Sequence, residues 1–585
     1  MIKRVLLFVL SGVVTVMIGC GGLVHDGTDF GRLDGFSLGV GHFNDSHACL
    51  EESSVTLVVE GTKIYAPVGG YARLAERALE MRADHENFLL LNAGDVFTGT
   101  LFFTRYKGAA DLDLMETMQV DAMVPGNHEF DQGPGVLADF IDQATFPLIA
   151  ANLDVSGDDR LAGKIAPYII KTFHGVPVGL FGLACEETPR VSSPGETVEF
   201  NASIPSARAA VDALKAQGIK VIIALTHQGV AADLKLAQSV NDIDLIVGGH
   251  SHTLLGDYSA ISLNASGLPY PLIEHSPDGH EVLIVQAWSK ARVLGELTLM
   301  FDGEGRVTHY NGTSQVLLGR RILRKNAEGE KVPVDPSTRD AIVDVVAGIP
   351  GLVFVSEEGP VAARIGELSL PIDAMRAEVL AQVPETLWHT RVPGSVHVQA
   401  GVLATGSLIA PHVAEAMLYQ AQEANMADVC IAIQNAGGVR TDLLRGDLTV
   451  GDAFSLLPFG NTLVTLSLTG DQIRRLLLEA AGLAVSSPTP GAFPYTAGLR
   501  YAWALKDETW EINEIEVFDK ERWVTLVPES VYRVITNSYL AKGGDGYPDF
   551  TGMAGFYDTG FVDVDGFMAY ARKMGTLSPL DMERN

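Results

Sequence analysis

Cysteine is scarce in this chain of 585 residues, which contains four. Cys20 lies near the N-terminus, and Cys49, Cys185 and Cys430 are far apart along the rest of the sequence. Three widely spaced cysteines form no disulfide framework, so the fold must depend on its hydrophobic core. The composition agrees, because 47% hydrophobic and 19% charged residues are typical of a globular rather than a disordered protein.

Basic residues are also few. The chain has 42 lysines and arginines against 72 aspartates and glutamates, which gives a formal net charge of −30 and a pI of about 4.8. A surface with this charge repels polyphosphate backbones, so we expect no nucleic-acid partner. A small anionic substrate would need local positive charge, supplied by arginines or by metal ions.

Long apolar runs are missing after the first twenty residues. Lys3 and Arg4 precede an apolar run over 5–18, which is shorter than the roughly 20 residues that span a bilayer. The run ends in MIGC, which resembles a bacterial lipobox and implies a lipoprotein signal peptide over 1–20 with lipid attached to Cys20. We therefore expect a periplasmic or cell-surface protein anchored to a membrane by lipid. The alternative is a plain signal peptide with an incidental cysteine.

Short apolar runs alternate with amphipathic segments from residue 36 onward. The runs predict strands over 36–43, 87–93, 121–126, 176–184, 220–226 and 244–249. Segments between them, such as 205–218, have helical periodicity. This alternation predicts an α/β fold in which helices cover layered sheets.

The length favours two domains. We expect the first over 34–325. Proline, glycine and acidic residues interrupt the helical stretches of 326–385, which we interpret as the linker region. A second α/β unit is expected over 386–585.

Polar side chains gather directly after the predicted strands of the first domain. They lie in the segments FNDSH, NAGDVFTG, GNHEFD, THQG and GGHSH and include Asp45, His47, Asp95, Asn127, His128, Asp131, His227, His250 and His252. In an open α/β sheet the loops at the carboxyl ends of the strands converge at one edge. Imidazole, carboxylate and amide ligands suit Zn or Mn better than Mg or Ca. The set exceeds one tetrahedral site, so a bridging carboxylate would divide it between two sites.

The ordered series D-x-H, GD, GNHE, H and GH-x-H resembles the calcineurin-like metallophosphoesterases, and motifs of the second half narrow this to the 5′-nucleotidase family. The resemblance implies a four-layer αββα catalytic domain, a helical linker and a C-terminal α/β substrate-binding domain. It also implies two divalent metal ions (Zn, Mn or Co). One would be held by Asp45, His47, Asp95 and His252, and the other by Asp95, Asn127, His227 and His250, with Asp95 bridging.

The same resemblance implies that His128 is catalytic rather than a ligand, with Asp131 orienting it. An imidazolium beside the phosphate can stabilise charge on the leaving oxygen. Asp131 could alternatively cap a helix over 133–140, and Glu129 is expected to be structural. Four histidines outside the motifs are expected to be ordinary surface or core residues: His25, His42, His85 and His280. Of these, His42 lies close to Asp45 in the sequence.

The second half carries segments that resemble the substrate-binding part of the same family. QNAGGVR (434–440) is similar to the family segment N-G-G-G-I-R, and the segments LLPFGNTL and NSYLAKGGDGY follow it. The resemblance implies two aromatics that sandwich a nucleobase and an aspartate that binds ribose. The residues implied are Asn435, Gly438, Arg440, Phe459, Tyr539 and Asp545. Core packing is the alternative for Phe459.

One segment departs from the family pattern. Residues 396–416 contain no arginine, and they have Ser407 and Pro411 where Asn and Asp are usual. Arg440 is thus the one arginine left at a position that binds phosphate in the family. Arg391 and Arg445 are candidates to replace the missing arginines. Arginine contacts carry much of phosphate recognition, so the preference for 5′-monophosphates is left open.

The sequence therefore predicts an extracytoplasmic two-metal phosphohydrolase that removes phosphate from nucleotides for nucleoside salvage. One alternative is a related phosphoesterase for 2′,3′-cyclic nucleotides, UDP-sugars or dinucleotides. Another is a nucleoside-binding surface lipoprotein without catalysis.

Overall fold

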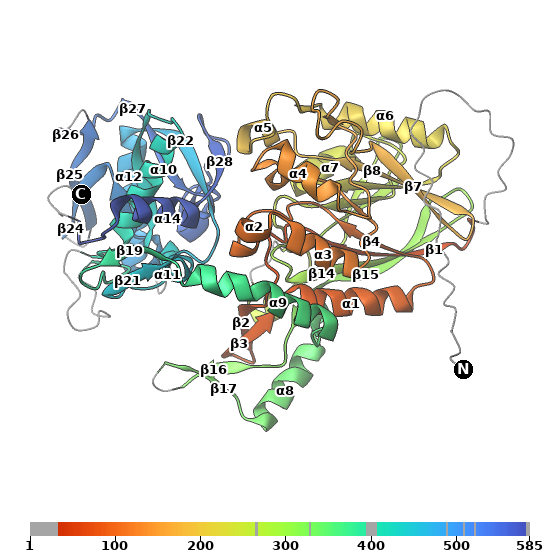
Figure 1. Ribbon diagram of the computed structural model, residues 1–585, viewed down its shortest axis with the longest axis horizontal. Helices are drawn as coiled ribbons and strands as arrows, with labels where there is room; N and C mark the ends of the chain where they lie inside the picture. The colour runs from red at the N-terminus through yellow and green to blue at the C-terminus, as the bar shows by residue number, and fades with distance from the viewer. Residues whose placement is uncertain are drawn as a thin grey trace, which may run out of the picture.

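The computed structural model describes residues 33–263, 267–326, 329–393, 406–486, 490–506, 509–519 and 522–580. The expected signal peptide, Cys20 and His25 lie outside these residues. Figure 1 shows an N-terminal body, coloured red to yellow-green, and a blue C-terminal body, with helix α9 (Gly359–Arg376) between them. Among the described residues, no helix is long and apolar enough to cross a membrane.

The first sheet of the N-terminal body is mixed and runs in the order β17–β16–β3–β15–β14–β1–β4–β5, with β2 paired to β3 and β18 to β15. Strands β1, β4 and β5 are parallel to one another, while β14 is antiparallel to β1. The bounds are β1 (Ser37–Phe43), β2 (Ser53–Val59), β3 (Thr62–Val68), β4 (Phe88–Asn92), β5 (Ala122–Met123), β14 (Val293–Phe301), β15 (Val307–Leu318), β16 (Leu323–Lys325), β17 (Lys331–Pro333) and β18 (Leu352–Phe354).

The second sheet runs in the order β12–β13–β11–β10–β8–β7. Its central strands β8, β10, β11 and β13 are parallel. The bounds are β7 (Tyr168–Phe173), β8 (Val176–Leu183), β10 (Val221–Thr226), β11 (Leu245–Gly248), β12 (Leu272–His275) and β13 (Glu281–Gln286), and β6 (Leu153–Asp154) pairs with β9 (Glu199–Phe200) outside it.

The two sheets pack face to face, because Leu89 and Leu91 of β4 share one buried cluster with Val178 and Ile223 of the second sheet. The alternate residues of β4 point to the outer face and pack with helices α1 (Tyr71–Asp84) and α3 (Ala109–Thr117). Helices α6 (Ser203–Lys215) and α7 (Val230–Ala237) cover the outer face of the second sheet. This is the four-layer αββα arrangement that the sequence resemblance implies.

Shorter helices occupy the edges of the N-terminal body. They are α2 (Leu101–Tyr106), α4 (Pro134–Ile141), α5 (Thr188–Val191) and the 3₁₀ turns η1 (His128–Phe130) and η2 (Ser259–Ile261). Helix α8 (Pro336–Ala347), together with β16 and β17, projects below the rest of the molecule in Figure 1. The N-cap of α8 is Asp335, whose carboxylate accepts the Thr338 N–H at 3.0 Å.

The C-terminal body is built on a mixed sheet in the order β23–β20–β27–β22–β28. The sheet strands are β20 (Val429–Asn435), β22 (Thr462–Thr469), β23 (Pro494–Ala497), β27 (Val531–Asn537) and β28 (Tyr557–Val562). Two smaller sheets consist of β19 (Val379–Val383), β21 (Gly446–Thr449), β24 (Leu499–Lys506), β25 (Thr509–Asp519) and β26 (Arg522–Thr525). The helices and turns are α10 (Ala410–Glu423), α11 (Val450–Leu456), α12 (Gly470–Ser486), α13 (Ser538–Ala541), α14 (Asp563–Met574), η3 (Ala436–Gly438), η4 (Pro490–Ala492) and η5 (Gly544–Gly546). The predicted α/β class is therefore confirmed in both halves.

Candidate metal centre

The predicted ligands lie on loops that follow parallel strands of both sheets. In the first sheet, β1, β4 and β5 are parallel, so the loops that follow them leave at one edge. In the second sheet, the same holds for the loops after β10 and β11. The face-to-face packing of the sheets brings these two sets of loops together.

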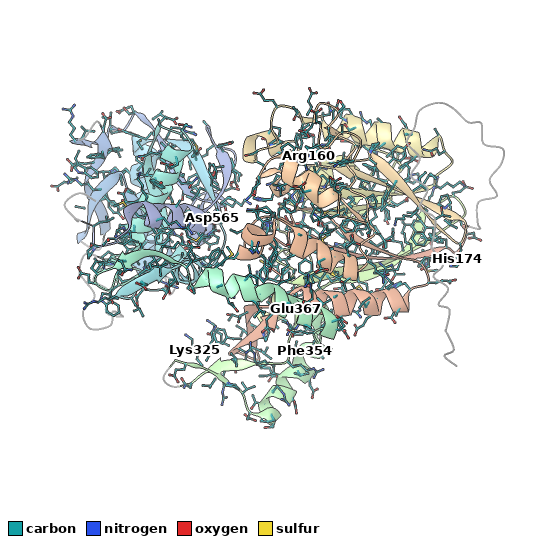
Figure 2. All side chains as sticks on the ribbon, viewed as in Figure 1. Arg160, His174, Lys325, Phe354, Glu367 and Asp565 are labelled. Carbon is teal, nitrogen blue, oxygen red and sulfur yellow. The ribbon has the colours of Figure 1, made fainter. Side chains whose placement is uncertain are left out.

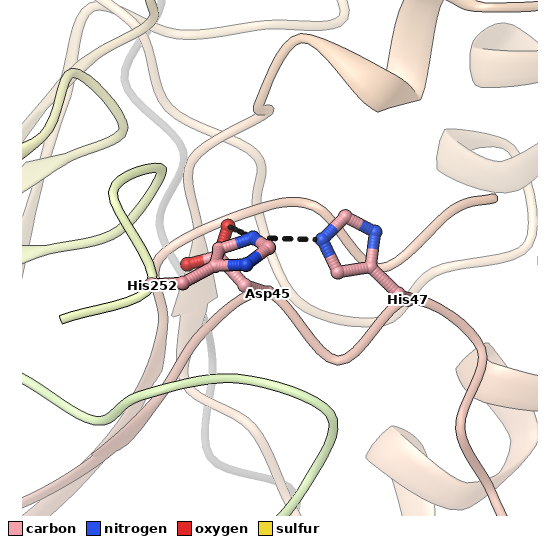
Figure 3. A group of neighbouring side chains, drawn as sticks. All are labelled: Asp45, His47 and His252. Atoms are coloured by element: carbon pink, nitrogen blue, oxygen red, sulfur yellow. Dashed lines mark hydrogen bonds and ion pairs between the residues drawn. The ribbon is translucent and has the colours of Figure 1, made fainter. Parts of the chain in front are cut away.

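The first group of ligand atoms belongs to Asp45, His47 and His252, which all lie within 4.8 Å of one another. Figure 3 shows the two imidazoles approaching from different loops, with the carboxylate beside them. The Nε2 atoms of His47 and His252 are 3.0 Å apart, and His252 Nε2 is 3.2 Å from Asp45 Oδ1. Two ring nitrogens and one carboxylate oxygen thus point into the same small volume.

The second group consists of Asp95, His227 and His250, again within 4.8 Å of one another. His227 Nε2 lies 3.0 Å from Asp95 Oδ2. His250 Nδ1 lies 2.9 Å from Asn127 Oδ1, so the amide joins this group. The structure therefore brings all seven predicted ligands to one edge, divided as the sequence resemblance implies.

The donor set fits two divalent cations. His227 Nδ1 is 2.6 Å from the carbonyl oxygen of Ala93, so its proton lies on Nδ1 and the Nε2 lone pair is directed into the site. That Nε2 is buried and makes no well-aligned hydrogen bond among the described residues, although Asp95 Oδ2 lies 3.0 Å away. A Cβ at Gly126 would come within 2.2 Å of Asp95 Oδ1, so this position tolerates only glycine beside the ligands. Nitrogen and oxygen donors of this kind suit Zn, Mn or Co.

The ligand loops have an unusual backbone conformation. Positive φ angles occur at five of the ligands: Asp45 (50°), His47 (50°), Asp95 (56°), His250 (74°) and His252 (51°). This left-handed region is sparsely populated by residues other than glycine, and it persists where surrounding contacts enforce it. Contacts with the surrounding fold therefore hold the ligand loops in this conformation. The sequence motifs alone do not reveal the conformation.

Glu129 supplies several of these contacts. Its buried carboxylate accepts the N–H groups of Asp95 (2.9 Å), Val96 (2.7 Å), Phe97 (3.1 Å) and Gly126 (2.6 Å). Burial and the charge of Asp95 raise the pKa of Glu129 to about 7, although these hydrogen bonds oppose the rise. Glu129, which the sequence predicts to be structural, thus ties the loop after β4 to the loop after β5. Its hydrogen bonds fix the backbone of both ligand-bearing loops.

His128 lies beside the ligands and is paired with Asp131, because His128 Nδ1 is 2.6 Å from Asp131 Oδ2. Thr98 and Ser192 also donate hydrogen bonds to Asp131, at 2.7 and 2.8 Å. Burial lowers the pKa of His128, but the charges of Asp131 and Asp95 outweigh it and raise the pKa to about 10. The imidazole is therefore held in one orientation and in its charged form.

The alternative role of Asp131 as a helix cap is wrong. Helix α4 begins at Pro134, its N-cap is Gly133, and no side chain caps it. The carboxylate instead bonds to His128, Thr98 and Ser192.

The described histidines outside the motifs lie away from the ligands. His42 is buried against Tyr270, with Nε2 2.8 Å from the hydroxyl, and burial lowers its pKa to about 3. His85 bonds to Met81 O and Thr298, and the partly exposed His280 pairs with Asp278.

A cavity of about 420 Å³ opens in front of the ligands and is lined by both domains. His47, Asp95, Asn127, His128 and His250 lie on the N-terminal wall. The C-terminal wall includes residues 459–462, Ser538, Lys542 and residues 556–558.

The predicted substrate residues of the C-terminal domain form a second group. Asn435 Nδ2 donates to Asp545 Oδ2 at 2.7 Å, and the Tyr539 hydroxyl donates to Asp545 Oδ1 at 3.1 Å. The Arg440 guanidinium lies 5.4 Å from the centre of the Phe459 ring. The same loop contains Gly438, where a Cβ would lie 2.3 Å from the Gln434 amide.

The aromatic side chains of this group are accessible, since Phe459 is 44% and Tyr539 48% exposed. Core packing of Phe459, the alternative considered above, is therefore wrong. Of the six predicted substrate residues, Phe459 lines the metal cavity and the other five do not. The structure thus leaves most of this group apart from the metal ligands.

The arginine-poor segment has a structural explanation at two positions, while residues 396–405 lie outside the described part of the chain. The buried Ser407 hydroxyl accepts the Ala410 N–H at 3.0 Å, and Pro411 lies in the first turn of α10. Both residues suit a helix start.

The two candidate replacement arginines differ in position. The charge of Arg391, after the effect of burial, lowers the pKa of Arg440, so the two guanidinium groups lie near each other. Arg445 is exposed, and its backbone N–H donates to Thr386. Arg391 is the one that the structure places with Arg440.

Sequence reasoning did not single out Glu129 as a positioning residue, nor the cavity lysines Lys290 and Lys542. The three residues are far apart in the sequence and belong to no shared spacing. A signal for Glu129 existed, because a carboxylate directly after a buried strand needs hydrogen-bond donors.

Comparison with known proteins agrees with this geometry. The family model described as "Calcineurin-like phosphoesterase" matches residues 38–254, and "5'-nucleotidase, C-terminal domain" matches residues 391–552. A "Probable 5'-nucleotidase" of Treponema pallidum is 34% identical over 92% of this chain and 92% of its own length. The solved NAD nucleotidase of Haemophilus influenzae has a TM-score of 0.76 at 31% identity, covering 94% of this chain and 98% of that one. A 5'-nucleotidase precursor from Thermus thermophilus has a TM-score of 0.60 at 35% identity, covering 92% and 97%.

Two ligand groups for divalent cations, a calcineurin-like catalytic domain and a nucleotidase C-terminal domain thus occur in one chain, which belongs to the 5′-nucleotidase family of metal-dependent phosphoester hydrolases.

Proposed function

We propose that this enzyme hydrolyses nucleotides outside the cytoplasm and releases phosphate, so that the nucleosides can be salvaged. The observation that supports it best is the convergence of seven ligand side chains, five of which line a cavity whose opposite wall belongs to the nucleotidase C-terminal domain. A nucleoside-binding lipoprotein without catalysis would have no need for this ligand set.

The roles of the ligands follow from their grouping. When bound, the two cations supply the positive charge that attracts a phosphoryl group and polarises it. Asp45, His47 and His252 would hold one of them, and Asn127, His227 and His250 the other, with Asp95 between the two groups. Glu129 keeps Asp95 in place through the backbone of its loop.

His128 has the role of a proton donor and charge stabiliser. Its Nδ1 is occupied by Asp131, which leaves Nε2–H for an oxygen of the substrate. Negative charge that develops on the leaving oxygen is stabilised there, and such assistance contributes about 10²–10⁴-fold to rates.

The C-terminal group is suited to the nucleoside. Phe459 and Tyr539 offer exposed ring faces for a base, and Asp545 can accept hydrogen bonds from ribose hydroxyl groups. Because five of these six residues lie away from the cavity, a rotation of the C-terminal domain would carry the bound nucleotide to the metal ligands.

A second candidate substrate is a dinucleotide. The arginines for phosphate are reduced to Arg440 and Arg391, which weakens the case for 5′-monophosphates alone. One of the similar proteins is an NAD nucleotidase, which supports this candidate.

The location rests on the N-terminal sequence. Two basic residues, a short apolar run and Cys20 support export and lipid attachment, which would anchor the chain to a membrane surface. Radiolabelled palmitate incorporation that is lost in Cys20→Ser tests this, and equal labelling of the variant would refute it.

Turnover of a substrate panel tests the function. The full chain in detergent is stripped of metal, reloaded with Zn, Mn or Co, and assayed for phosphate release from nucleoside 5′-monophosphates, NAD, a UDP-sugar and 2′,3′-cyclic nucleotides. We expect metal-dependent release of phosphate from nucleotides. Nucleoside binding without hydrolysis under every metal would overturn the proposal.

A further inference from the structure

Two lysines line the cavity in front of the metal ligands, one from each domain. Lys290 follows β13 in the N-terminal domain, and Lys542 follows α13 in the C-terminal domain. Neither has a carboxylate within ion-pair distance among the described residues, although the chain carries a net charge of −30. Two such ammonium groups at one cavity are suited to an anion.

Lys290 is tied directly to the ligand loops. Its backbone N–H donates to the carbonyl oxygen of Asp45 at 2.7 Å, and it has a positive φ of 59°. Its side-chain Nζ donates to the carbonyl oxygen of Phe459 at 2.5 Å, across the domain boundary. An ammonium group has three donors, so two remain for a ligand between the metal ligands and the predicted base-binding aromatic.

Lys542 approaches the same cavity from the segment that carries Tyr539 and Asp545. Lys542 and the ligand His250 line this cavity together. The carboxylates on the cavity wall outside the ligand set are Glu187 and Asp558. Asp558 accepts hydrogen bonds from the Thr462 hydroxyl at 2.8 Å and the Gly560 N–H at 3.2 Å.

A nucleotide monophosphate has one phosphoryl group, and the metal ligands already provide for it. A pyrophosphate-linked nucleotide carries a second, negatively charged phosphoryl group beside the one under attack. Leaving that charge inside a partly closed cavity without a partner would be costly, and lysine is a common partner for phosphate. Hydrolysis of the linkage consumes one water, breaks one P–O bond and forms another, so no further reactant is needed.

We propose that Lys290 and Lys542 bind the phosphoryl group next to the one under attack, so that the enzyme favours pyrophosphate-linked nucleotides, such as dinucleotides and nucleoside diphosphates, over 5′-monophosphates. The inference rests on the proposed nucleotide hydrolysis. Under this proposal, Lys290 and Lys542 supply the positive charge for phosphate that arginines in the segment 396–416 would otherwise provide.

Variants Lys290→Gln and Lys542→Gln test the proposal in the metal-loaded enzyme. The ratio of kcat/KM for NAD to kcat/KM for AMP is expected to fall about tenfold in each and further in the double variant, since one charge-assisted contact is worth about that factor. Lys542→Arg should restore most of the ratio. The exposed Lys325, on β16 away from the cavity (Figure 2), provides the control Lys325→Gln, with an unchanged ratio.

A ratio that stays constant in both lysine variants would overturn the proposal. So would an equal loss for NAD and AMP, which is the result expected if Lys290 only links the two domains through Phe459.

Binding provides a readout that does not depend on turnover. Calorimetry with adenosine 5′-(α,β-methylene)diphosphate, which is not hydrolysed between its phosphorus atoms, should show affinity about tenfold weaker in each lysine variant, with adenosine affinity unchanged. Equal affinity of the analogue for wild type and variants refutes the lysine site. If the wild type hydrolyses neither NAD nor AMP, the proposed function fails, and the calorimetry still decides whether the lysines bind a diphosphate.

Discussion

The two functional groups of this molecule are built differently. In the N-terminal domain the ligands Asp45, Asp95 and His227 are at most 1% exposed. In the C-terminal domain Phe459 and Tyr539 are 44% and 48% exposed. Most of the first group is enclosed by the fold, although the His252 side chain is 39% exposed, while the aromatic rings of the second group lie on an open surface.

The contacts around each group match this contrast. The ligand loops are held by backbone hydrogen bonds to Glu129 and by the Ala93 carbonyl, and they adopt strained left-handed conformations. Tyr539 and Asp545 mainly contact each other and Asn435. Cations require ligand atoms at fixed positions, whereas stacking of a base on a ring tolerates small displacements. The comparison therefore predicts that substitutions affect the first group through metal content and the second through KM.

The largest effect is expected for Asp95→Asn. Asp95 belongs to the second ligand group and is proposed to lie between the two. The loss of its carboxylate removes charge that the cations need, so metal content should fall and turnover should decrease about 10⁴-fold or more. Elemental analysis together with an assay of phosphate release measures both. Asp139→Asn, at a side chain that is 66% exposed, serves as the control. Full metal occupancy in Asp95→Asn would contradict its proposed bridging role.

His128→Ala separates catalysis from metal binding within the enclosed group. Metal content should stay normal while turnover falls about 10²–10⁴-fold, because the charged imidazole at the leaving oxygen is lost. The same substitution at His280, whose side chain is 44% exposed, should change neither quantity. Unchanged turnover of His128→Ala would remove it from the mechanism.

Glu129→Gln tests whether the enclosure itself matters. The amide carries no charge and offers one acceptor oxygen where the carboxylate accepts four N–H groups, so the loops after β4 and β5 should loosen. We expect metal affinity to fall about 10–100-fold, as for other residues that orient ligands. Titration with a metal-binding dye in competition measures it, and Glu367→Gln on the exposed face of α9 (Figure 2) is the control. Wild-type affinity in Glu129→Gln would show that the loops hold without it.

The smallest effect is expected on the open group. Tyr539→Ala should raise KM about tenfold with metal content unchanged, because one stacking surface is worth on the order of 1–3 kcal/mol. Tyr539→Phe keeps the ring and should retain most of the affinity. The equally exposed Phe518, on β25, gives the control Phe518→Ala. A loss of metal in Tyr539→Ala would mean that the two groups are not independent.

Much of the metal centre was predictable because its side chains follow buried strands in short motifs. The ligands and their division into two groups follow from those motifs and the family resemblance, and the structure places them accordingly. A structural role for Glu129 was predictable, but its hydrogen-bond partners were not, because its four donors come from two loops that are far apart in the sequence. Lys290 and Lys542 were missed because each becomes relevant only when both domains meet at one cavity.

The orientation of the C-terminal domain relative to the cavity was also beyond sequence reasoning. Motifs show that Asn435, Phe459 and Asp545 belong to one function, but they carry no information about domain orientation. Similarly, Arg391 and Arg445 are equivalent in sequence, and the tertiary structure brings Arg391 close enough to Arg440 for its charge to lower the pKa of Arg440.

By itself the sequence determined which chemical groups follow each strand, because strand alternation and turn residues act over a few positions. The tertiary structure decided that these groups meet. His47 and His252 are 205 residues apart, and their rings come within 3.0 Å because two separate sheets pack face to face. Local preferences set the end of each strand, and the burial of the apolar layer between the sheets sets the distance between the ends.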